Sequence, residues 1–246
     1  MILPMASPSE RQAVILAGGL GTRMRPVTET IPKPMISVAG KPFLQHQLEL
    51  LRRSGIERAL LLVAYLGEQI QQYFGDGRKF GSKVSYSFEP TPLGTGGALK
   101  NAEALLEDSF FLVNGDTYLP IAYRELTQKF AELNCAALIV AYEKPGTGYR
   151  DIPANQVPNN LAVNSNGVVT AYHKRNPEGM SHIDAGVILL KKEILVKLPE
   201  GQTSSVEEQI YPRLIEQGEM RAWVTSEPFY DMGSPAGLAA LEEKLA

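Results

Sequence analysis

Glycines and basic residues gather in one loop near the start of this chain. An apolar run, Ala13–Leu16, leads into Gly18–Gly21, where only position 20 carries a side chain. Because glycine lacks a Cβ atom, backbone N–H groups in such a turn can approach a ligand closely and form a concave anion site. Arg23, Arg25 and Lys33 add positive charge. This combination favours a polyphosphate site beyond a strand end over a plain strand-to-turn loop with incidental basic residues.

Two other glycine-rich loops do not fit these residues. A Walker loop requires GxxxxGK[ST], and neither Gly-Lys-Ser nor Gly-Lys-Thr occurs in the chain. A dinucleotide loop requires GxGxxG/A at the start of a helix, but the third position after Gly19 and Gly21 is Met24. Pro26 would disrupt that helix, and Val38 stands about twenty positions on, where an acidic residue should bind ribose. A dehydrogenase is therefore disfavoured.

Strand-like and helix-like segments alternate along the chain, which predicts an α/β fold. We expect strands at 13–16, 58–64, 83–88, 110–114, 136–142, 161–164, 168–173, 184–190 and 221–225, and helices at 41–54, 67–74, 95–106, 122–133, 193–198, 205–217 and 235–245. This order predicts a three-layer, Rossmann-like, mainly parallel sheet. Ligands of such sheets bind beyond the carboxyl ends of the strands.

Length and composition exclude several classes of protein. The 246 residues carry a net charge of −3, which gives no basic surface for nucleic acid. A single cysteine, Cys135, excludes an internal disulfide, and three scattered histidines lack zinc-site spacing. No apolar run is long enough to span a membrane, and residues 1–11 resemble a disordered leader, not a signal peptide. We expect a cytoplasmic protein with one domain at 12–246 and leave a homo-oligomer open.

The first loop also carries a family resemblance. LAGGxGTRxRPxTxxxPKP resembles the opening of the sugar-phosphate nucleotidylyltransferases, and the similarity extends from about Gln12 to Leu245. That family joins a nucleoside triphosphate to a sugar 1-phosphate and releases pyrophosphate. The resemblance implies the nucleotide-diphospho-sugar transferase fold, with a nucleotide-binding half at 12–142 and a sugar-binding half, including a small β-containing lobe, at 159–246. It assigns nucleotide binding to Leu16, Ala17, Gly18, Gly19, Gly21 and Thr22, and catalysis to Arg23 and Lys33.

Two aspartates are candidates for a metal site. Asp116 follows the apolar run Phe110–Val113, so a parallel sheet would place it at the same edge as the glycine loop. A carboxylate beside a triphosphate implies a divalent ion, and Mg²⁺ prefers one or two carboxylates with phosphate oxygens and water. The family resemblance adds Asp231, in FYDMGSP, as the second ligand. The alternative is that Asp116 is a turn residue and Asp231 a helix N-cap.

The resemblance supplies the remaining site residues. PLGTGGA resembles a second nucleotide-contacting loop, although its glycines would also suit tight helix packing, and Lys174 is the expected lysine for the sugar phosphate. His173 stands where the family usually has Glu, and Asp184 where it has Asn, so both depart from the pattern on the sugar side. His173 could bond the sugar or face solvent. The implied contacts are Gly94, Thr95, Gly96 and Gly115 for the nucleotide, and His173, Asp184 and Gly186 for the sugar.

The substrates are less sharply indicated than the reaction. The tail from Ser204 to Pro235 resembles small enzymes that use GTP and a manno-configured heptose 1-phosphate. Similar short enzymes use UTP with N-acetylmuramic acid 1-phosphate, or dTTP or CTP with glucose 1-phosphate. We expect GTP, a heptose or mannose 1-phosphate and Mg²⁺. A catalytically silent sugar-nucleotide-binding regulator is the alternative from another class, and the long segment 143–158 has no assigned role.

Overall fold

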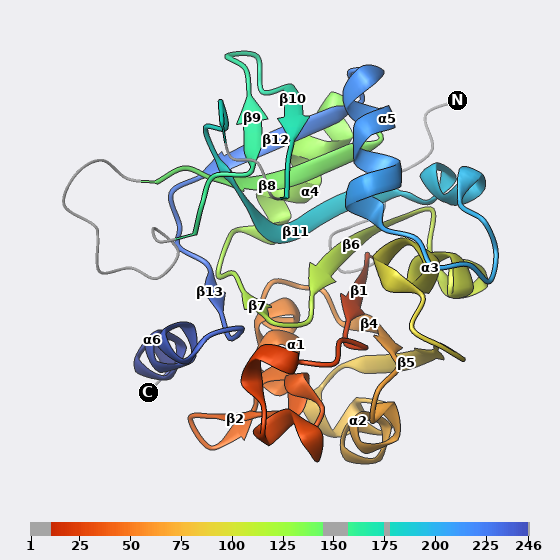
Figure 1. Ribbon diagram of the computed structural model, residues 1–246, viewed down its shortest axis with the longest axis vertical. Helices are drawn as coiled ribbons and strands as arrows, with labels where there is room; N and C mark the ends of the chain where they lie inside the picture. Colours follow the sequence, from red (N-terminus) through yellow and green to blue (C-terminus); the bar gives the residue numbers. More distant parts are fainter. Residues whose placement is uncertain (1–10, 145–156, 175–177, 246) are drawn as a thin grey trace.

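A sheet of seven strands runs through the molecule and carries helices on both faces (Figure 1). The computed structural model describes residues 11–144, 157–174 and 178–245. Nearly all of the expected leader and most of the segment 143–158 lie outside these residues. Arg11, the last residue of that leader, is buried, with its guanidinium 5.7 Å from the centre of the Phe130 ring.

The central sheet has the strand order β12-β8-β11-β6-β1-β4-β5. Its strands are β1 (Gln12–Leu16), β4 (Arg58–Val63), β5 (Lys83–Phe88), β6 (Ser109–Asn114), β8 (Ala137–Tyr142), β11 (Ile183–Lys191) and β12 (Met220–Thr225). Strand β11 is antiparallel to both of its neighbours, whereas the other pairings are parallel. The predicted mainly parallel α/β sheet is confirmed.

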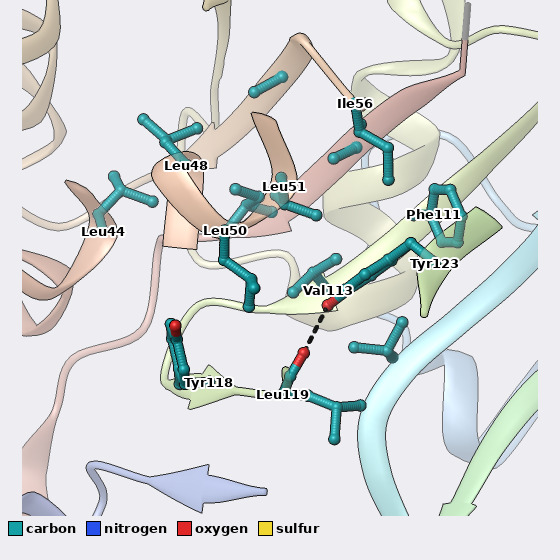
Figure 2. Close-up of a cluster of buried hydrophobic side chains, with 14 of the residues drawn as sticks. Leu44, Leu48, Leu50, Leu51, Ile56, Phe111, Val113, Tyr118, Leu119 and Tyr123 are labelled. Carbon is teal, nitrogen blue, oxygen red and sulfur yellow. Dashed lines mark hydrogen bonds between the residues drawn. The ribbon is translucent and has the colours of Figure 1, made fainter. Parts of the chain in front are cut away.

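The two faces of the sheet form two separate hydrophobic cores. Successive side chains of a strand point to opposite faces, so Ala13 and Ile15 enter one core and Val14 the other. The first core is covered by α1 (Phe43–Arg53), α2 (Gly67–Phe74), α4 (Tyr123–Leu133) and α6 (Pro235–Leu245), the second by α3 (Gly94–Asn101) and α5 (Tyr211–Glu216). Figure 2 shows part of the first core, where Leu50 and Leu51 of α1 lie near Val113 of β6.

Short elements connect this framework and build its edges. Three two-stranded pairs are β2 (Ser37–Val38) with β3 (Lys41–Pro42), β7 (Thr117–Tyr118) with β13 (Tyr230–Asp231), and β9 (Leu161–Val163) with β10 (Val169–Tyr172). The 3₁₀ turns are η2 (Thr22–Met24), η3 (Val27–Glu29), η4 (Lys33–Met35), η5 (Arg78–Phe80), η6 (Glu103–Leu105) and η8 (Lys192–Lys197). None of the helices in the described ranges is both long and apolar enough to span a bilayer.

The helix expected at 205–217 has a different form in the structure. Its first part, η9 (Val206–Ile210), has π-helical hydrogen bonding and continues directly into α5. Pro212 supplies a physical reason, because it has no N–H group to bond to the carbonyl four residues earlier. Similarly, the helix expected from residue 41 begins at Phe43, after Lys41 and Pro42 have paired with β2.

Candidate functional site

The glycine loop and the first aspartate meet where β1 and β6 end. Leu16 pairs with Asn114 across these parallel strands, so the residues that follow each of them emerge side by side. Gly115 passes very close to β1: a Cβ atom there would lie 2.1 Å from the carbonyl oxygen of Leu16. No side chain fits at that distance, so this glycine permits the close approach of the two strand ends.

A pocket of about 400 Å³ opens at this edge. Its lining combines the glycine loop, the start of α3 and the turn after β6: Leu16, Gly18, Gly19, Leu20, Lys33, Pro34, Leu62, Glu89, Pro92, Gly94, Thr95, Ala98, Asn114, Gly115, Asp116 and Glu207. Size, glycine content and mixed polarity suit a nucleotide-sized ligand.

The second aspartate is joined to the first through a short pair of strands. Asp231 of β13 pairs with Thr117 of β7, the residue directly after Asp116. The N–H of Met232 donates to the carbonyl oxygen of Asp116 at 3.0 Å. Two aspartates that are 115 positions apart in the sequence therefore share one corner of the site.

Positive charge surrounds these carboxylates. Lys33 Nζ lies 2.5 Å from Asp116 Oδ2, and the lysine is only 9% exposed. A Cβ atom on Gly233 would lie 2.7 Å from Arg23 Nη2 and 2.8 Å from Asp231 Oδ1, so the guanidinium reaches the neighbourhood of the second carboxylate. Burial, followed by the nearby charge of Asp116, raises the pKa of Asp231. The positive charges of Lys33 and Arg23 oppose this rise in the pKa of Asp231.

The donor set at this corner fits Mg²⁺ that is shared with a phosphate. Within the described ranges, no group of three or more His, Cys, Asp or Glu residues could enclose a metal ion. Asp116 and Asp231 provide two carboxylates, and Mg²⁺ commonly takes one or two of these and completes its shell with phosphate oxygens and water. The repulsion that raises the pKa of Asp231 is also the interaction that a divalent cation would relieve.

Comparison with known proteins identifies the family. The family model described as nucleotidyl transferase matches residues 12–246. The chain belongs to the nucleotidyl transferase family.

The chain covers different shares of its relatives' length. It is 32% identical to the D-glycero-alpha-D-manno-heptose 1-phosphate guanylyltransferase of Campylobacter jejuni, over 91% of this chain and 95% of that protein. Identity to the mannose-1-phosphate guanylyltransferase of Mycobacterium tuberculosis is also 32%, over 91% of this chain but only 61% of the relative. HddC from Yersinia pseudotuberculosis, solved in complex with GMP-PN, superposes with a TM-score of 0.81 at 32% identity, covering 96% of this chain and 100% of that one.

Some of the residues predicted to bind nucleotide line the pocket, and the others do not. Those that line the pocket are Leu16, Gly18, Gly19, Gly94, Thr95 and Gly115. Gly21 shapes the loop behind it, since a Cβ atom there would lie 2.8 Å from Thr28 and its φ is +60°. The N–H of Gly96 donates to the carbonyl of Ser204, a packing contact. Ala17 is buried and Thr22 is exposed at the start of η2.

The predicted sugar-side residues lie at the start of β11 and directly after β10. Asp184 Oδ1 accepts a hydrogen bond from the N–H of Gly186 at 2.9 Å. Burial is the main cause that raises the pKa of Asp184 to about 6, and the charge of Glu207 adds to it, whereas the Gly186 N–H and Lys174 oppose the rise. Lys174 and His173 are exposed, and the backbone N–H of His173 donates to Asn160.

Two glutamates in the pocket were not predicted from the sequence. Glu89 directly follows β5, and its Oε2 accepts the N–H of Leu93 at 2.8 Å. A Cβ atom on Gly18 would lie 2.9 Å from the other oxygen, Oε1, which places this carboxylate beside the glycine loop. Burial raises the pKa of Glu89, an effect that the Leu93 N–H partly offsets. Its one sequence signal was its place at a strand end, just before the glycine-rich start of α3.

Glu207 connects the nucleotide side of the pocket to the sugar side. Its Oε2 accepts the hydroxyls of Thr95 at 2.8 Å and Ser205 at 2.6 Å. Although burial raises the pKa of Glu207, these hydroxyls, its backbone environment and Lys174 together lower it below the usual value. The ionised Glu207 carboxylate therefore bonds to Thr95 of the second loop, and its charge also acts on Asp184. The sequence offered no signal for a contact between positions so far apart.

Proposed function

We propose that this chain transfers a nucleotidyl group from a nucleoside triphosphate to a sugar 1-phosphate, forming an NDP-sugar and releasing pyrophosphate. The observation that carries this proposal is the meeting of Asp116 and Asp231, with Lys33 and Arg23, beside the pocket at the end of β1. Family membership supports the reaction type. Because the heptose guanylyltransferase matches over nearly its whole length, it favours GTP and a heptose or mannose type of sugar.

In the proposed reaction, an oxygen of the sugar 1-phosphate attacks the α-phosphorus of the nucleotide. A new P–O bond forms, and the bond from the α-phosphorus to the bridging oxygen breaks, so pyrophosphate leaves with the electron pair. The attacking phosphate is already ionised near neutral pH, so the step needs positioning and charge neutralisation more than a general base. A Mg²⁺ ion held by Asp116 and Asp231 would supply part of that neutralisation.

The basic residues have separate parts in this scheme. Arg23, from the loop after β1, holds the leaving pyrophosphate, with Arg25 as an exposed neighbour in the same turn. Lys33 belongs to η4 and Lys174 lies just beyond β10. These two lysines draw the anionic reactants together, which reduces their mutual repulsion before the P–O bond forms.

Glu89 supports guanine as the base. A carboxylate only accepts hydrogen bonds, and guanine offers two adjacent donors, N1–H and the N2 amino group. Uracil and thymine present a single N3–H between two carbonyls, and adenine and cytosine present an amino group next to an acceptor nitrogen. Oε2 of Glu89 already accepts the N–H of Leu93. Its other oxygen, Oε1, faces the glycine loop that would border the base. Each alternative base would bring an acceptor against the carboxylate.

Acidic residues on the sugar side suit a substrate that is rich in hydroxyl groups. The charge of Glu207 helps to raise the pKa of Asp184, and Lys174 lowers the pKa of both carboxyls. Carboxylates accept hydrogen bonds from sugar hydroxyls, while the lysine can pair with the 1-phosphate. His173 is exposed, so we assign it a contact at the rim of the sugar site.

The test is pyrophosphate release from matched pairs of substrates. GTP, UTP, dTTP, CTP and ATP are each combined with mannose 1-phosphate, the manno-heptose 1-phosphate, glucose 1-phosphate and N-acetylmuramic acid 1-phosphate. We expect release with GTP and a manno-configured sugar, and loss of release on chelation of Mg²⁺ and in Asp116→Asn. Binding of GTP without release from any pair would overturn the proposal in favour of a silent sugar-nucleotide sensor.

A further inference from the structure

Gln47 is a buried polar residue on the core-facing side of α1. It is 2% exposed and stands in the sequence between Leu44, Leu48 and Leu51, buried residues of the first core. A polar amide at such a position is unfavourable unless it is hydrogen-bonded. The partners of this glutamine therefore indicate what it does.

The Gln47 amide bridges the two ends of the turn that carries the first aspartate. Its Nε2 donates to the carbonyl oxygen of Asn114 at 2.8 Å and to that of Thr117 at 2.7 Å. The residues between these two carbonyls are Gly115 and Asp116. The two amide hydrogens of Gln47 thus bond to the two ends of a single turn, and that turn carries a carboxylate.

The oxygen atom of the Gln47 amide is less favourably placed than its nitrogen. Oε1 of Gln47 is buried and has no hydrogen-bond partner in the part of the chain that the structure describes. Turning the amide over would point this oxygen at two carbonyl oxygens, so the observed orientation is the favourable one. A leucine or methionine would fill the same space without an unpaired oxygen, which argues that the bridge itself is the reason for a glutamine.

We propose that Gln47 is a positioning residue that holds the Asn114–Thr117 turn in the shape that presents the Asp116 carboxylate to the metal and the phosphates. The N–H of Met232 fixes the carbonyl of Asp116 from the opposite side. With both supports in place, the peptide units around Asp116 have little freedom to rotate, and its carboxylate stays beside Asp231. This inference rests on the proposed metal-dependent nucleotidyl transfer.

The matched pair Gln47→Met and Gln12→Met tests it. Gln12 is also a buried glutamine bonded to backbone: its Nε2 donates to Leu105 and its Oε1 accepts from Glu107, at the far end of β1. We expect Gln47→Met to weaken Mn²⁺ binding at least tenfold, measured by EPR with an unreactive GTP analogue. The half-saturating Mg²⁺ concentration for pyrophosphate release should rise and kcat should fall, with KM for the sugar phosphate little changed.

Comparison with Gln12→Met separates positioning from stability. That variant should lose thermal stability to a similar degree while keeping wild-type Mn²⁺ affinity. Should Gln47→Met not fold, Gln47→Asn keeps the amide but is too short to span both carbonyls, and the same weakening is expected. Wild-type Mn²⁺ affinity in either folded Gln47 variant would overturn the inference.

The Mn²⁺ measurement also separates this inference from the proposed reaction. Normal Mn²⁺ binding by a wild-type protein that releases no pyrophosphate would defeat the reaction alone, and the comparison of variants would still decide the role of Gln47. A wild-type protein that binds no Mn²⁺ with nucleotide would overturn both.

Discussion

Lys33 Nζ lies 2.5 Å from Asp116 Oδ2, although the two residues are 83 positions apart. The lysine side chain is 10% exposed and the aspartate side chain 30%, so the pair is only partly screened by water. Pro32 and Pro34 flank the lysine and restrict the backbone that carries it. In the chain alone, this ammonium is the countercharge of the carboxylate that we assign to the metal.

Removal of the Lys33 ammonium should destabilise the fold, because it leaves the Asp116 carboxylate without its countercharge. We expect Lys33→Met to lower the free energy of unfolding by about 1–3 kcal/mol, between the values typical of exposed and buried pairs. In the Asp116→Asn background the same change should cost much less, because no carboxylate remains unpaired. Urea unfolding of the four proteins of this double-mutant cycle measures the coupling. Lys41→Met, which breaks an exposed pair with Glu49, is the control and should cost at most about 0.5 kcal/mol.

Ionised Asp231 should lower the stability of the fold at neutral pH, yet be required for activity. Burial and the charge of Asp116 raise its pKa, so its ionised form opposes folding above that pKa and the penalty disappears as the pH falls below the unfolded value. We expect Asp231→Asn to unfold at equal or higher urea concentration than the wild type at pH 7, and to lose this advantage in acid. Pyrophosphate release should fall at least about 100-fold, since a metal ligand is lost. An Asp231→Asn protein that keeps wild-type kcat would contradict the metal assignment.

The pairing of the glycine loop with Asp116 followed from the sequence because it depends on one topological rule. Parallel strands present their carboxyl ends at one edge, and the structure aligns Leu16 with Asn114 in adjacent strands. Hydrophobic runs were sufficient to locate both strands. The link to Asp231 could not be derived this way, since it depends on a two-residue pairing of β7 with β13, which is too short to leave a pattern.

The contacts of Glu89, Glu207 and Gln47 could not be predicted from the sequence, for related reasons. A glutamate is usually solvated, so the place of Glu89 at a strand end does not by itself separate it from exposed glutamates. The bond from Thr95 to Glu207 forms only when η9 packs against α3. Gln47 lies on the same face of α1 as its leucines, and periodicity alone does not tell a bridging amide from an interruption of an apolar stripe.

Glu89 should determine the preference for GTP. Glu89→Gln replaces one acceptor by a donor that would face guanine N–H groups, so we expect kcat/KM for GTP to fall by about 10–100-fold, the loss typical of a charge-assisted hydrogen bond. The ratio of GTP to UTP turnover should fall as well, because the amide can bond a pyrimidine carbonyl. Rates with each triphosphate at saturating sugar phosphate measure both effects. Glu103→Gln, in the turn after α3, should leave the ratio unchanged, and an unchanged ratio in Glu89→Gln would remove Glu89 from base recognition.

Asp184 should make stability depend on pH in the direction opposite to an ion-paired aspartate. Its pKa of about 6 in the folded chain exceeds the ordinary value of 3.8, so the folded state holds a proton that the unfolded state releases between these pH values. The resulting penalty is absent below about pH 4, grows through this window and is complete above about pH 6. Asp184→Asn keeps an oxygen for the Gly186 N–H and should be more stable than the wild type at pH 8 by on the order of 2 kcal/mol.

At pH 4 that advantage should vanish, because the wild-type carboxyl is then protonated in both states. Urea unfolding at pH 4, 6 and 8 measures the difference, and the same series on Asp76→Asn, an exposed aspartate, should show no such growth with pH. An Asp184→Asn advantage that stays constant from pH 4 to pH 8 would mean that packing, and not the cost of charging a buried carboxyl, sets the effect. A growing advantage would instead show that this chain sacrifices stability near neutral pH to keep an ionised acceptor where the sugar hydroxyls are expected to bind.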